Sequence, residues 1–265
     1  MSGIIAGRNP VREALDGAGA GVEKVYLQAG AHGSAIDVIR RRARDAGVPV
    51  QVVPQARLAR LAPGLHHQGV VAIAAEVAYA DVDEMLSAAA PDLDGVRARR
   101  PLFVALDEIE DPHNLGAILR SAVAAGAAGA IVPERRSAPL SAVAVRASAG
   151  MALRLPVARV TNLADVLLAA KERGYWVVGL EGGDAPAGVQ PTTVWEWDWA
   201  RPTVLVVGNE GRGLRPRVAA ACDALASIPM PGPAESLNAS VAAGVALMYA
   251  ARSRAAPPEE GDAAT

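Results

Sequence analysis

The sequence predicts an α/β protein with a large parallel sheet and a smaller α/β domain in front of it. From Pro101 onward, apolar segments of strand length alternate with helical segments, a pattern typical of a parallel sheet that helices cover on both faces. The 265 residues are 51% hydrophobic and 20% charged, as in a globular protein with one large or two modest domains.

Several classes of protein are excluded at once. No run of about 18 apolar residues free of charge occurs, so we expect no membrane span. The first residues lack the basic and apolar leader of a secreted protein, so we expect a cytoplasmic location. The single cysteine, Cys222, excludes an internal disulfide bond and a thiolate zinc site, and the four histidines suggest no metal site.

Residues 1–77 have the pattern of the small α/β domain, with Ser34 as the candidate cap of its first expected helix. We expect strands at 22–28, 48–54 and 69–77 and helices at 35–47 and 55–62. This part carries nine basic and six acidic residues, a net charge of +3, against 17 and 22, or −5, in the remainder. The positive net charge is compatible with an RNA-binding face or with an ordinary solvated surface. The same two interpretations apply to the run Arg40, Arg41, Arg42 and Arg44.

The larger domain is expected at residues 101–254, between a linker at 78–100 and a disordered tail at 255–265. The linker is predicted from its polar sequence, although residues 81–90 have a helical pattern. Within the domain we expect strands at 101–109, 130–134, 155–160, 175–182, 202–210 and 224–230, and helices at 114–126, 141–153, 162–174, 215–224 and 238–254.

The first segment with unusual chemistry is LDEIEDPHNLGAILRSA, residues 106–122. Asp111 and Pro112 end a strand, and a helix is expected to begin near Asn114. Arg120 interrupts an otherwise apolar helix, and a buried arginine needs either an internal ion pair or an anionic ligand. Six residues separate Asn114 from Arg120, roughly 120° from alignment on an ideal helix. The two would meet only if Asn114 lies in a looser first turn.

The second segment is VLVVGNEGRGL, residues 204–214, in which a buried strand runs into three glycines around Glu210. Glycines let the backbone turn sharply and approach a ligand closely. Their order differs from the GxGxxG of dinucleotide-binding folds, and the Gly-Lys-Ser/Thr of a phosphate loop is absent.

The third segment is IPMPGPAESLNASVAAG, residues 228–244, a proline-containing loop before the last helix. Ser236 and Asn238 stand near the start of that helix, and either side chain could cap it. Two caps two residues apart are redundant.

Together these segments resemble the three signature motifs of the SpoU (TrmH) branch of the SPOUT RNA methyltransferases. The first motif matches at Asn114, Gly116 and Arg120, although Ser121 stands where threonine is usual. The other matches are Gly208, Glu210, Gly211 and Gly213, and then Ile228, Pro229, Met230, Gly232, Ser236, Leu237 and Asn238. The ends of the small domain, IAGRNPVREAL and HHQGVVA, resemble the L30e/L7Ae-like domain of bacterial 23S rRNA guanosine 2'-O-methyltransferases.

The resemblance implies transfer of a methyl group from S-adenosylmethionine to a ribose 2'-hydroxyl of RNA. It implies that the catalytic domain contains a trefoil knot whose loops hold the cofactor, and that the chain is a homodimer. Guanosine of 23S rRNA is the favoured substrate. A tRNA, or rRNA methylated for antibiotic resistance, is the alternative within the family, and a non-catalytic RNA-binding assembly protein is the alternative outside it.

The resemblance also implies roles for individual residues. Arg120 is the essential residue, and a phosphate clamp suits it better than a general base, because a guanidinium rarely loses its proton. Asn114 and Glu210 would orient Arg120 and the ribose, with Glu210 pairing with the guanidinium; His113 is a weaker candidate base. Ser236 and Asn238 would line the same pocket. The residues expected to hold the cofactor are Gly208, Gly211, Gly213, Ile228, Met230, Gly232 and Leu237.

Overall fold

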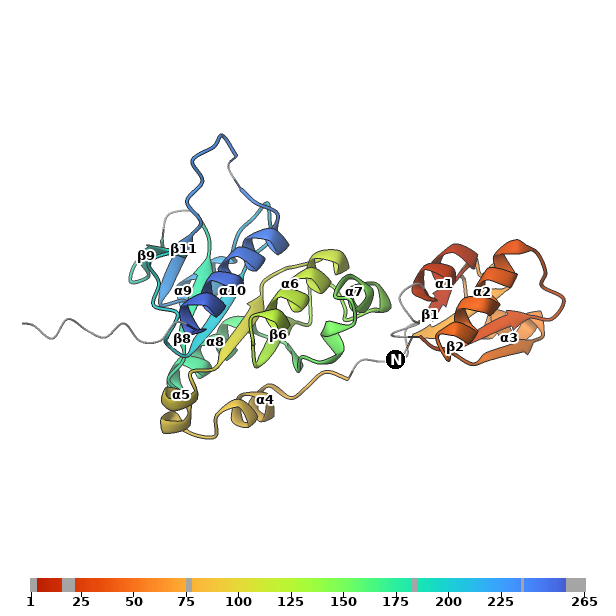
Figure 1. Cartoon of the computed structure of the whole chain (residues 1–265), viewed down its shortest axis with the longest axis horizontal. Coiled ribbons are helices and arrows are strands. Elements are labelled where there is room, and N and C mark those ends of the chain that lie inside the picture. Colours follow the sequence, from red (N-terminus) through yellow and green to blue (C-terminus); the bar gives the residue numbers. More distant parts are fainter. Residues whose placement is uncertain (1–3, 16–21, 75–77, 183–184, 235, 256–265) are drawn as a thin grey trace, which may run out of the picture. The chain divides into compact units, whose positions relative to one another are not determined.

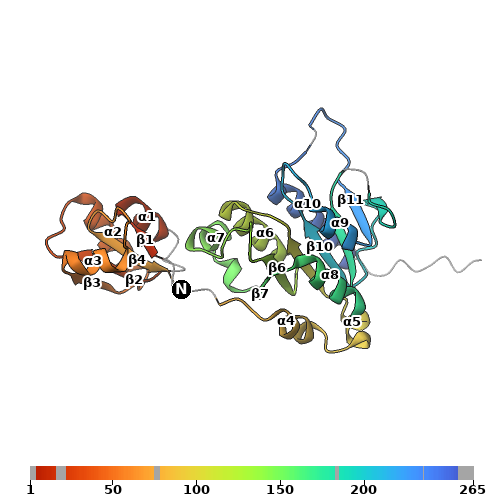
Figure 2. The same ribbon diagram turned by 180° about the vertical axis from the view of Figure 1, so that it is seen from behind.

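The computed structural model of the chain describes residues 4–15, 22–74, 78–182, 185–234 and 236–255. It divides into two compact units (Figures 1 and 2). The smaller unit comprises residues 1–78 and 139–153, and the larger unit comprises residues 79–138 and 154–265. None of the helices in the described part of the chain is both long and apolar enough to cross a membrane.

The smaller unit is built on a mixed four-stranded sheet in the order β1-β4-β2-β3. The strands are β1 (Ile4–Ala6), β2 (Val22–Gln28), β3 (Val50–Val53) and β4 (Val70–Ala74). The helices that accompany them are α1 (Arg8–Leu15), α2 (Ser34–Asp45) and α3 (Gln55–Leu61). Strand β4 is antiparallel to β1 and β2, and β2 is parallel to β3. The carboxyl ends of β1, β2 and β3 therefore meet at one edge of the sheet.

Alternation along β4 explains how both faces of this sheet are covered. Val70 and Ala72 belong to the core formed with α1 and α2, whereas Val71 packs in a separate core with Leu58 of α3. The expected strands and helices of this domain are present, preceded by β1 and α1. Ser34 is not the cap of α2, because the cap position is Gly33, which has no side chain to donate or accept. Residues 75–77 of the expected third strand lie outside the described residues.

The larger unit confirms the predicted α/β class with a parallel sheet. Seven strands pair in the order β7-β6-β5-β10-β8-β11-β9, and every pair is parallel. They are β5 (Leu102–Leu106), β6 (Gly129–Pro133), β7 (Val157–Val160), β8 (Trp176–Leu180), β9 (Gln190–Thr193), β10 (Thr203–Val207) and β11 (Ala224–Ser227). The sequence did not indicate β9, a short edge strand that contains Pro191, as edge strands tolerate. The expected trefoil knot stays a prediction.

Helices cover both faces of the large sheet. They are α4 (Val82–Ala89), α5 (Leu93–Arg99), α6 (Pro112–Ala124), α8 (Leu163–Glu172), α9 (Pro216–Ala221) and α10 (Ala239–Ala255). One core joins α4, α5, α8 and α9 to Phe103, Ala105, Val204 and Val206 of the sheet. The opposite face is left to α6 and α10, which pack against each other (Figure 1). A short helix α7 (Ala142–Ala147) and a 3-10 turn at Met151–Leu153 complete the helices among the described residues.

The segment 78–100, expected to be a linker, instead forms helices α4 and α5 of the larger unit. Asp81 and Asp92 cap their first turns through backbone N–H groups. Met85, at 5% exposure, packs against Gly129, where any Cβ would collide with its sulfur. Each helix buries so few apolar residues that its sequence resembles a polar connection.

Candidate active site

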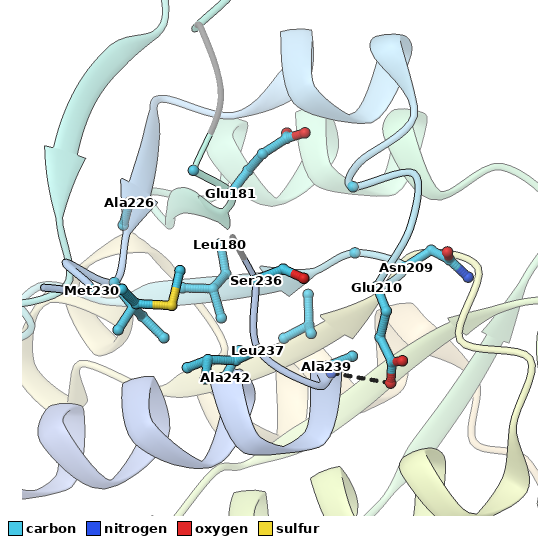
Figure 3. A pocket seen from close by; sticks show the side chains of 15 residues that line it. Leu180, Glu181, Asn209, Glu210, Ala226, Met230, Ser236, Leu237, Ala239 and Ala242 are labelled. Atoms are coloured by element: carbon cyan, nitrogen blue, oxygen red, sulfur yellow. Dashed lines mark hydrogen bonds between the residues drawn. The ribbon is translucent and has the colours of Figure 1, made fainter. Parts of the chain in front are cut away.

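A pocket opens where the carboxyl ends of three neighbouring strands, β10, β8 and β11, meet the start of α10 (Figure 3). Crevices at this edge of parallel sheets are the usual place for ligands. Of the residues expected to hold the cofactor, five line the pocket: Gly208, Gly213, Ile228, Met230 and Leu237. Gly211 and Gly232 do not line it and are exposed. The sequence did not indicate the other walls, notably Leu180, Glu181, Ala226 and Ala242.

Glycine is required at two points of the loop that follows β10. The loop folds back on itself, because Asn209 and Gly213 exchange backbone hydrogen bonds of 3.0 and 2.9 Å. A Cβ on Gly208 would lie 2.6 Å from the carbonyl carbon of Gly213. Gly213 has a φ of +64°, and a Cβ there would overlap the Glu181 carboxylate. The glycines thus allow this close crossing beside the pocket.

Glu210 is held by donors from two of the other motif segments. Its Oε1 accepts hydrogen bonds from Asn114 Nδ2 at 2.7 Å, Asn238 Nδ2 at 2.5 Å and the Ala239 backbone N–H at 3.2 Å. Asn238 Nδ2 also donates to Asn114 Oδ1 at 3.1 Å. Glu210 Oε2 has no hydrogen-bond partner among the described residues. The network fixes one carboxylate oxygen and leaves the other available at the edge of the pocket.

Asn238, rather than Ser236, caps the last helix. Its Oδ1 accepts hydrogen bonds from the backbone N–H of Ser240 at 2.9 Å and of Val241 at 3.3 Å. Ser236 lines the pocket, and its hydroxyl has no hydrogen-bond partner in the described part of the chain (Figure 3). The redundancy between the two candidate caps is therefore resolved, and Ser236 remains free to contact a ligand.

Arg120 is placed differently from the expectation. It is exposed on α6, does not line the pocket, and forms no hydrogen bond or ion pair with any described residue. The expected burial and the expected pairing with Glu210 are both wrong, because Leu115, Ile118 and Leu119 supply the buried face of α6 and Arg120 falls outside it. The helix begins at Pro112, so Asn114 lies in regular helix and the angular offset from Arg120 remains. His113 is also exposed and outside the pocket.

Two buried carboxylates that the sequence analysis did not single out fix the position of the Glu210 loop. Asp107 is fully buried, and its oxygens accept hydrogen bonds from Arg215 Nε at 2.7 Å and the Arg215 backbone N–H at 2.8 Å. Glu108, 3% exposed, pairs with Arg136 at 3.0 Å, and its carbonyl accepts a bond from Asn209 Nδ2 at 3.1 Å. The sequence signal that could have identified them is a pair of adjacent acidic residues at the end of an apolar strand. Such residues are buried with the strand, and a buried charge needs a partner.

Among the described residues, the charged groups that line the pocket are Glu181 and Glu210, both of them acidic. Burial is the main cause that raises the pKa of Glu181 above its ordinary value of 4.5, and the negative charge of Asp107 adds to the rise. A hydrogen bond from the Leu214 backbone acts in the opposite direction. Among the described residues, no group of three or more His, Cys, Asp or Glu side chains is arranged to hold a metal ion.

Comparison with known proteins decides the family. Residues 101–248 match the SpoU rRNA methylase family, and residues 4–80 match a domain described as RNA 2'-O ribose methyltransferase substrate binding. The chain belongs to the SpoU rRNA methylase family. It is an RNA methyltransferase, and it uses S-adenosylmethionine.

Relatives and solved structures of the SpoU family agree with this assignment. An uncharacterized tRNA/rRNA methyltransferase of Mycobacterium ulcerans is 46% identical over 94% of this chain and 77% of its own length. The SpoU methyltransferase AviRb from Streptomyces viridochromogenes, solved with AdoMet, is 27% identical, with a TM-score of 0.61 over 96% of this chain and 90% of its own. An AdoMet-bound rRNA methyltransferase from Sinorhizobium meliloti is 30% identical, with a TM-score of 0.57 over 95% and 87%.

The pocket of this SpoU protein fits S-adenosylmethionine in its chemistry. The cofactor carries a flat adenine, a sulfonium cation and an ammonium group. Leu180, Ile228 and Leu237 offer apolar contacts for the adenine. Glu181 and Glu210 offer negative charge for the cationic groups.

Proposed function

We propose that this SpoU protein methylates the ribose 2'-hydroxyl of a guanosine in 23S rRNA and acts as a homodimer. The observation that carries the chemistry is the network of Asn114, Glu210 and Asn238, which joins three sequence segments beside the cofactor pocket. The description of the matched N-terminal domain supports the ribose 2'-oxygen. The preference for 23S rRNA guanosine rests on the resemblance of IAGRNPVREAL and HHQGVVA.

The residues of the pocket have separate tasks in this proposal. When bound, S-adenosylmethionine supplies an electrophilic methyl group. The free Oε2 of Glu210 accepts a hydrogen bond from the ribose, and Ser236, which lines the same pocket, contacts the same sugar. Because Asn114 and Asn238 hold Oε1, the carboxylate keeps one orientation, and such positioning supplies a large part of a methyl-transfer rate.

Arg120 binds the RNA phosphate next to the target ribose. Its guanidinium is exposed and has no partner among the described residues, so both edges of the fork are available to phosphate oxygens. A phosphate clamp on one flank and the Glu210 carboxylate on the other would fix the ribose between them. The clamped guanidinium would also stabilise negative charge that develops on the 2'-oxygen.

The proposed homodimer is supported by apolar side chains on α10. Val241 and Met248 are both 51% exposed on this helix, and Trp195, at 42% exposure, contacts Tyr249 of α10. Exposed apolar groups gathered on one helix are typical of an interaction surface. Light scattering is expected to give twice the 27.1 kDa mass of one chain. A Met248→Asp variant, which places a charge on the proposed interface, is expected to shift towards the mass of the single chain.

Methyl transfer with labelled S-adenosylmethionine tests the function directly. Unmodified 23S rRNA and tRNA are supplied separately, and the product nucleosides are identified by mass spectrometry. The proposal expects 2'-O-methylguanosine from 23S rRNA alone. A product from tRNA would keep the reaction and overturn the substrate. No product from either RNA, repeated with ribosomal precursor particles, would favour a non-catalytic role.

A further inference from the structure

The smaller unit contains a second cavity, at the edge of its sheet where the carboxyl ends of β1, β2 and β3 meet. Its volume is about 840 Å³, and its walls come from four loops: Arg8 after β1, Gln28 to His32 after β2, Gln55 after β3, and Leu65 to Gly69 before β4. A cavity of this size lies within the range of about 300–1,000 Å³ that is typical of small-ligand sites.

The lining of this cavity is rich in polar side chains, and none of the described residues in it is acidic. The ionisable residues that line it are Arg8, His32, His66 and His67, and the amides Gln28, Gln55 and Gln68 complete the polar wall. None of the four acidic residues among the described part of 1–77, Glu13, Glu23, Asp37 and Asp45, lines it. A wall with the Arg8 cation, three histidines and three amides, and no carboxylate among the described residues, suits an anionic ligand with hydrogen-bonding edges.

Arg8 is held so that its guanidinium stays available. Its Nε donates to the Gln68 carbonyl at 3.2 Å, and its backbone N–H donates to Gln68 Oε1 at 3.2 Å. The two terminal nitrogens have no partner among the described residues. Arg8 is also the first residue of α1, whose N-terminal dipole favours negative charge. A phosphate oxygen is the ligand that this arrangement suits.

The histidines present defined hydrogen-bonding edges. His67 Nδ1 accepts from the Gly69 N–H at 3.1 Å, so its other ring nitrogen, Nε2, carries a proton and can donate. His32 Nδ1 lies 2.8 Å from the Gly30 carbonyl, which can only accept, so Nε2 of the neutral His32 ring is an acceptor. One donor, one acceptor and three glutamine amides match the mixed edge of a nucleobase.

We propose that this cavity binds an unpaired nucleotide of the substrate RNA, with its phosphate on Arg8 and its base among the histidines and glutamines. The inference rests on the proposed RNA methylation and deepens it by naming where the N-terminal domain holds the substrate. Unpaired nucleotides are the elements through which proteins usually read RNA sequence, because their edges and faces are accessible. The Arg40–Arg44 run of α2 is the competing RNA contact, and it lies on a helix surface that does not line this cavity.

Two pairs of charge variants in the full-length chain test the cavity. Gln55→Glu adds a negative charge to the cavity wall, and Gln51→Glu adds the same charge at an exposed position of β3 outside it. Arg8→Gln removes the cavity cation, and Arg60→Gln removes an exposed cation of α3 outside the cavity. Gln55 begins α3, where a carboxylate is compatible with the helix, so this variant is expected to fold even if Arg8→Gln disturbs its loop. Thermal unfolding and S-adenosylmethionine binding establish that each variant is intact.

Filter binding of unmodified 23S rRNA transcript gives the first readout. Arg8→Gln and Gln55→Glu are each expected to weaken binding about tenfold, the effect of losing one charge-assisted phosphate contact. Arg8→Gln should also reduce the slope of log affinity against log salt by about 0.7, as for one single-strand phosphate. The two control variants are expected to stay within about twofold of the unmodified protein, as for exposed charges. Cavity variants that match their controls would overturn the proposal.

Methyl-transfer kinetics separate this proposal from the proposed function. With the transcript as substrate, the cavity variants are expected to raise KM about tenfold and leave kcat nearly unchanged, because only RNA binding is weakened. If the unmodified protein methylates no 23S rRNA, the proposed function fails, whereas the binding comparison still decides the cavity. If it methylates normally and KM is the same in all four variants, the cavity proposal fails alone.

Discussion

The two units of the chain each carry a cavity at the carboxyl ends of their strands, and the two cavities have opposite charge. Among the described residues, the ionisable groups that line the larger unit's pocket are Glu181 and Glu210, whereas those that line the smaller unit's cavity are Arg8 and three histidines. Most side chains in the pocket wall are apolar, whereas three glutamines and three histidines contribute to the cavity wall. Sheet topology places both sites, and side-chain charge decides which ligand each one suits: a cationic cofactor in the first and an anionic nucleic acid in the second.

The difference extends to how each site is held. Asp107, Glu108 and their arginine partners fix the loop that carries Glu210, so the pocket depends on ion pairs whose carboxylates are buried and whose arginines are partly exposed. The cavity depends on loops whose polar side chains bond mainly to nearby backbone groups, such as Arg8 to Gln68. The pocket is therefore expected to be sensitive to single changes in its supports, and the cavity to changes in surface charge and salt.

The largest expected effect tests whether the larger unit also has an RNA-facing cation. Arg120→Ala is expected to lower kcat by about 10²- to 10³-fold, the size of loss seen when a stabilising donor is removed from a reacting oxygen. S-adenosylmethionine binding, measured by calorimetry, is expected to stay nearly unchanged because Arg120 lies outside the pocket. Normal turnover by this variant would remove Arg120 from the proposed machinery.

A conservative variant and a distant one control this result. Arg120→Lys keeps the positive charge but loses the bidentate fork, so it is expected to retain partial activity. Arg217→Ala removes an exposed arginine that pairs with Asp165 on the surface, and it is expected to have little effect.

The next effect concerns the carboxylate shared by the motif segments. Glu210→Gln is expected to lower kcat about 10- to 100-fold, because a neutral amide holds the three N–H donors less strongly and loses charge at the pocket. Glu110→Gln is the matched control, since Glu110 is exposed, pairs with Arg212 and lies outside the pocket. Equal activities for the two variants would contradict the role given to Glu210.

A smaller effect is expected on the free energy of unfolding, and it tests the buried carboxylate Asp107 that supports the Glu210 loop. Asp107→Asn leaves Arg215 without its anionic partner and is expected to lower the free energy of unfolding by about 2 kcal/mol, less than a fully buried pair because Arg215 is 39% exposed. Asp198→Asn breaks an exposed pair with Arg201 and is expected to change it by less than about 1 kcal/mol. Denaturant unfolding measures both, and equal losses would mean that burial does not distinguish these pairs.

Much of the fold follows from local sequence pattern. The strands of the large sheet are apolar runs with clear boundaries, as in β5 and β10, so their pattern needs no tertiary information. Helices α4 and α5 were predicted as a linker because their burial depends on the sheet they pack against. The edge strand β9 was not indicated, since its order comes from pairing with β11 and not from its own residues.

The candidate site also depends on contacts between distant segments, which local sequence pattern does not reveal. The resemblance named Asn114, Glu210 and Asn238, and the structure brings them together, but the pairing of Glu210 with Arg120 is wrong because helix phase directs Arg120 to solvent. Asp107 and Arg215 are 108 residues apart, and no local pattern could join them. Residues that act through contacts distant in sequence are therefore the ones that sequence reasoning misses.

The smallest expected effect concerns the charge of the cofactor pocket itself. S-adenosylmethionine carries one more positive charge than the demethylated product, so ionised Glu181 is expected to favour the cofactor over the product. Glu181→Gln should reduce this preference about three- to tenfold, as for a partly exposed ion pair, measured by calorimetric titration of both compounds. Gln190→Glu, on an exposed residue of β9 outside the pocket, is expected to leave the preference unchanged.

The pH dependence of stability tests the direction of the pKa shift of Glu181. Because burial raises the pKa of Glu181, the folded state holds this proton more tightly than the unfolded state. The stability that Glu181 contributes is therefore full below the ordinary value of 4.5 and is lost as the pH rises through the raised pKa. Glu181→Gln lacks this loss, so its free energy of unfolding relative to the unmodified protein should increase as the pH rises above 4.5. A difference that stays constant with pH would mean that burial does not raise the pKa of the Glu181 carboxylate.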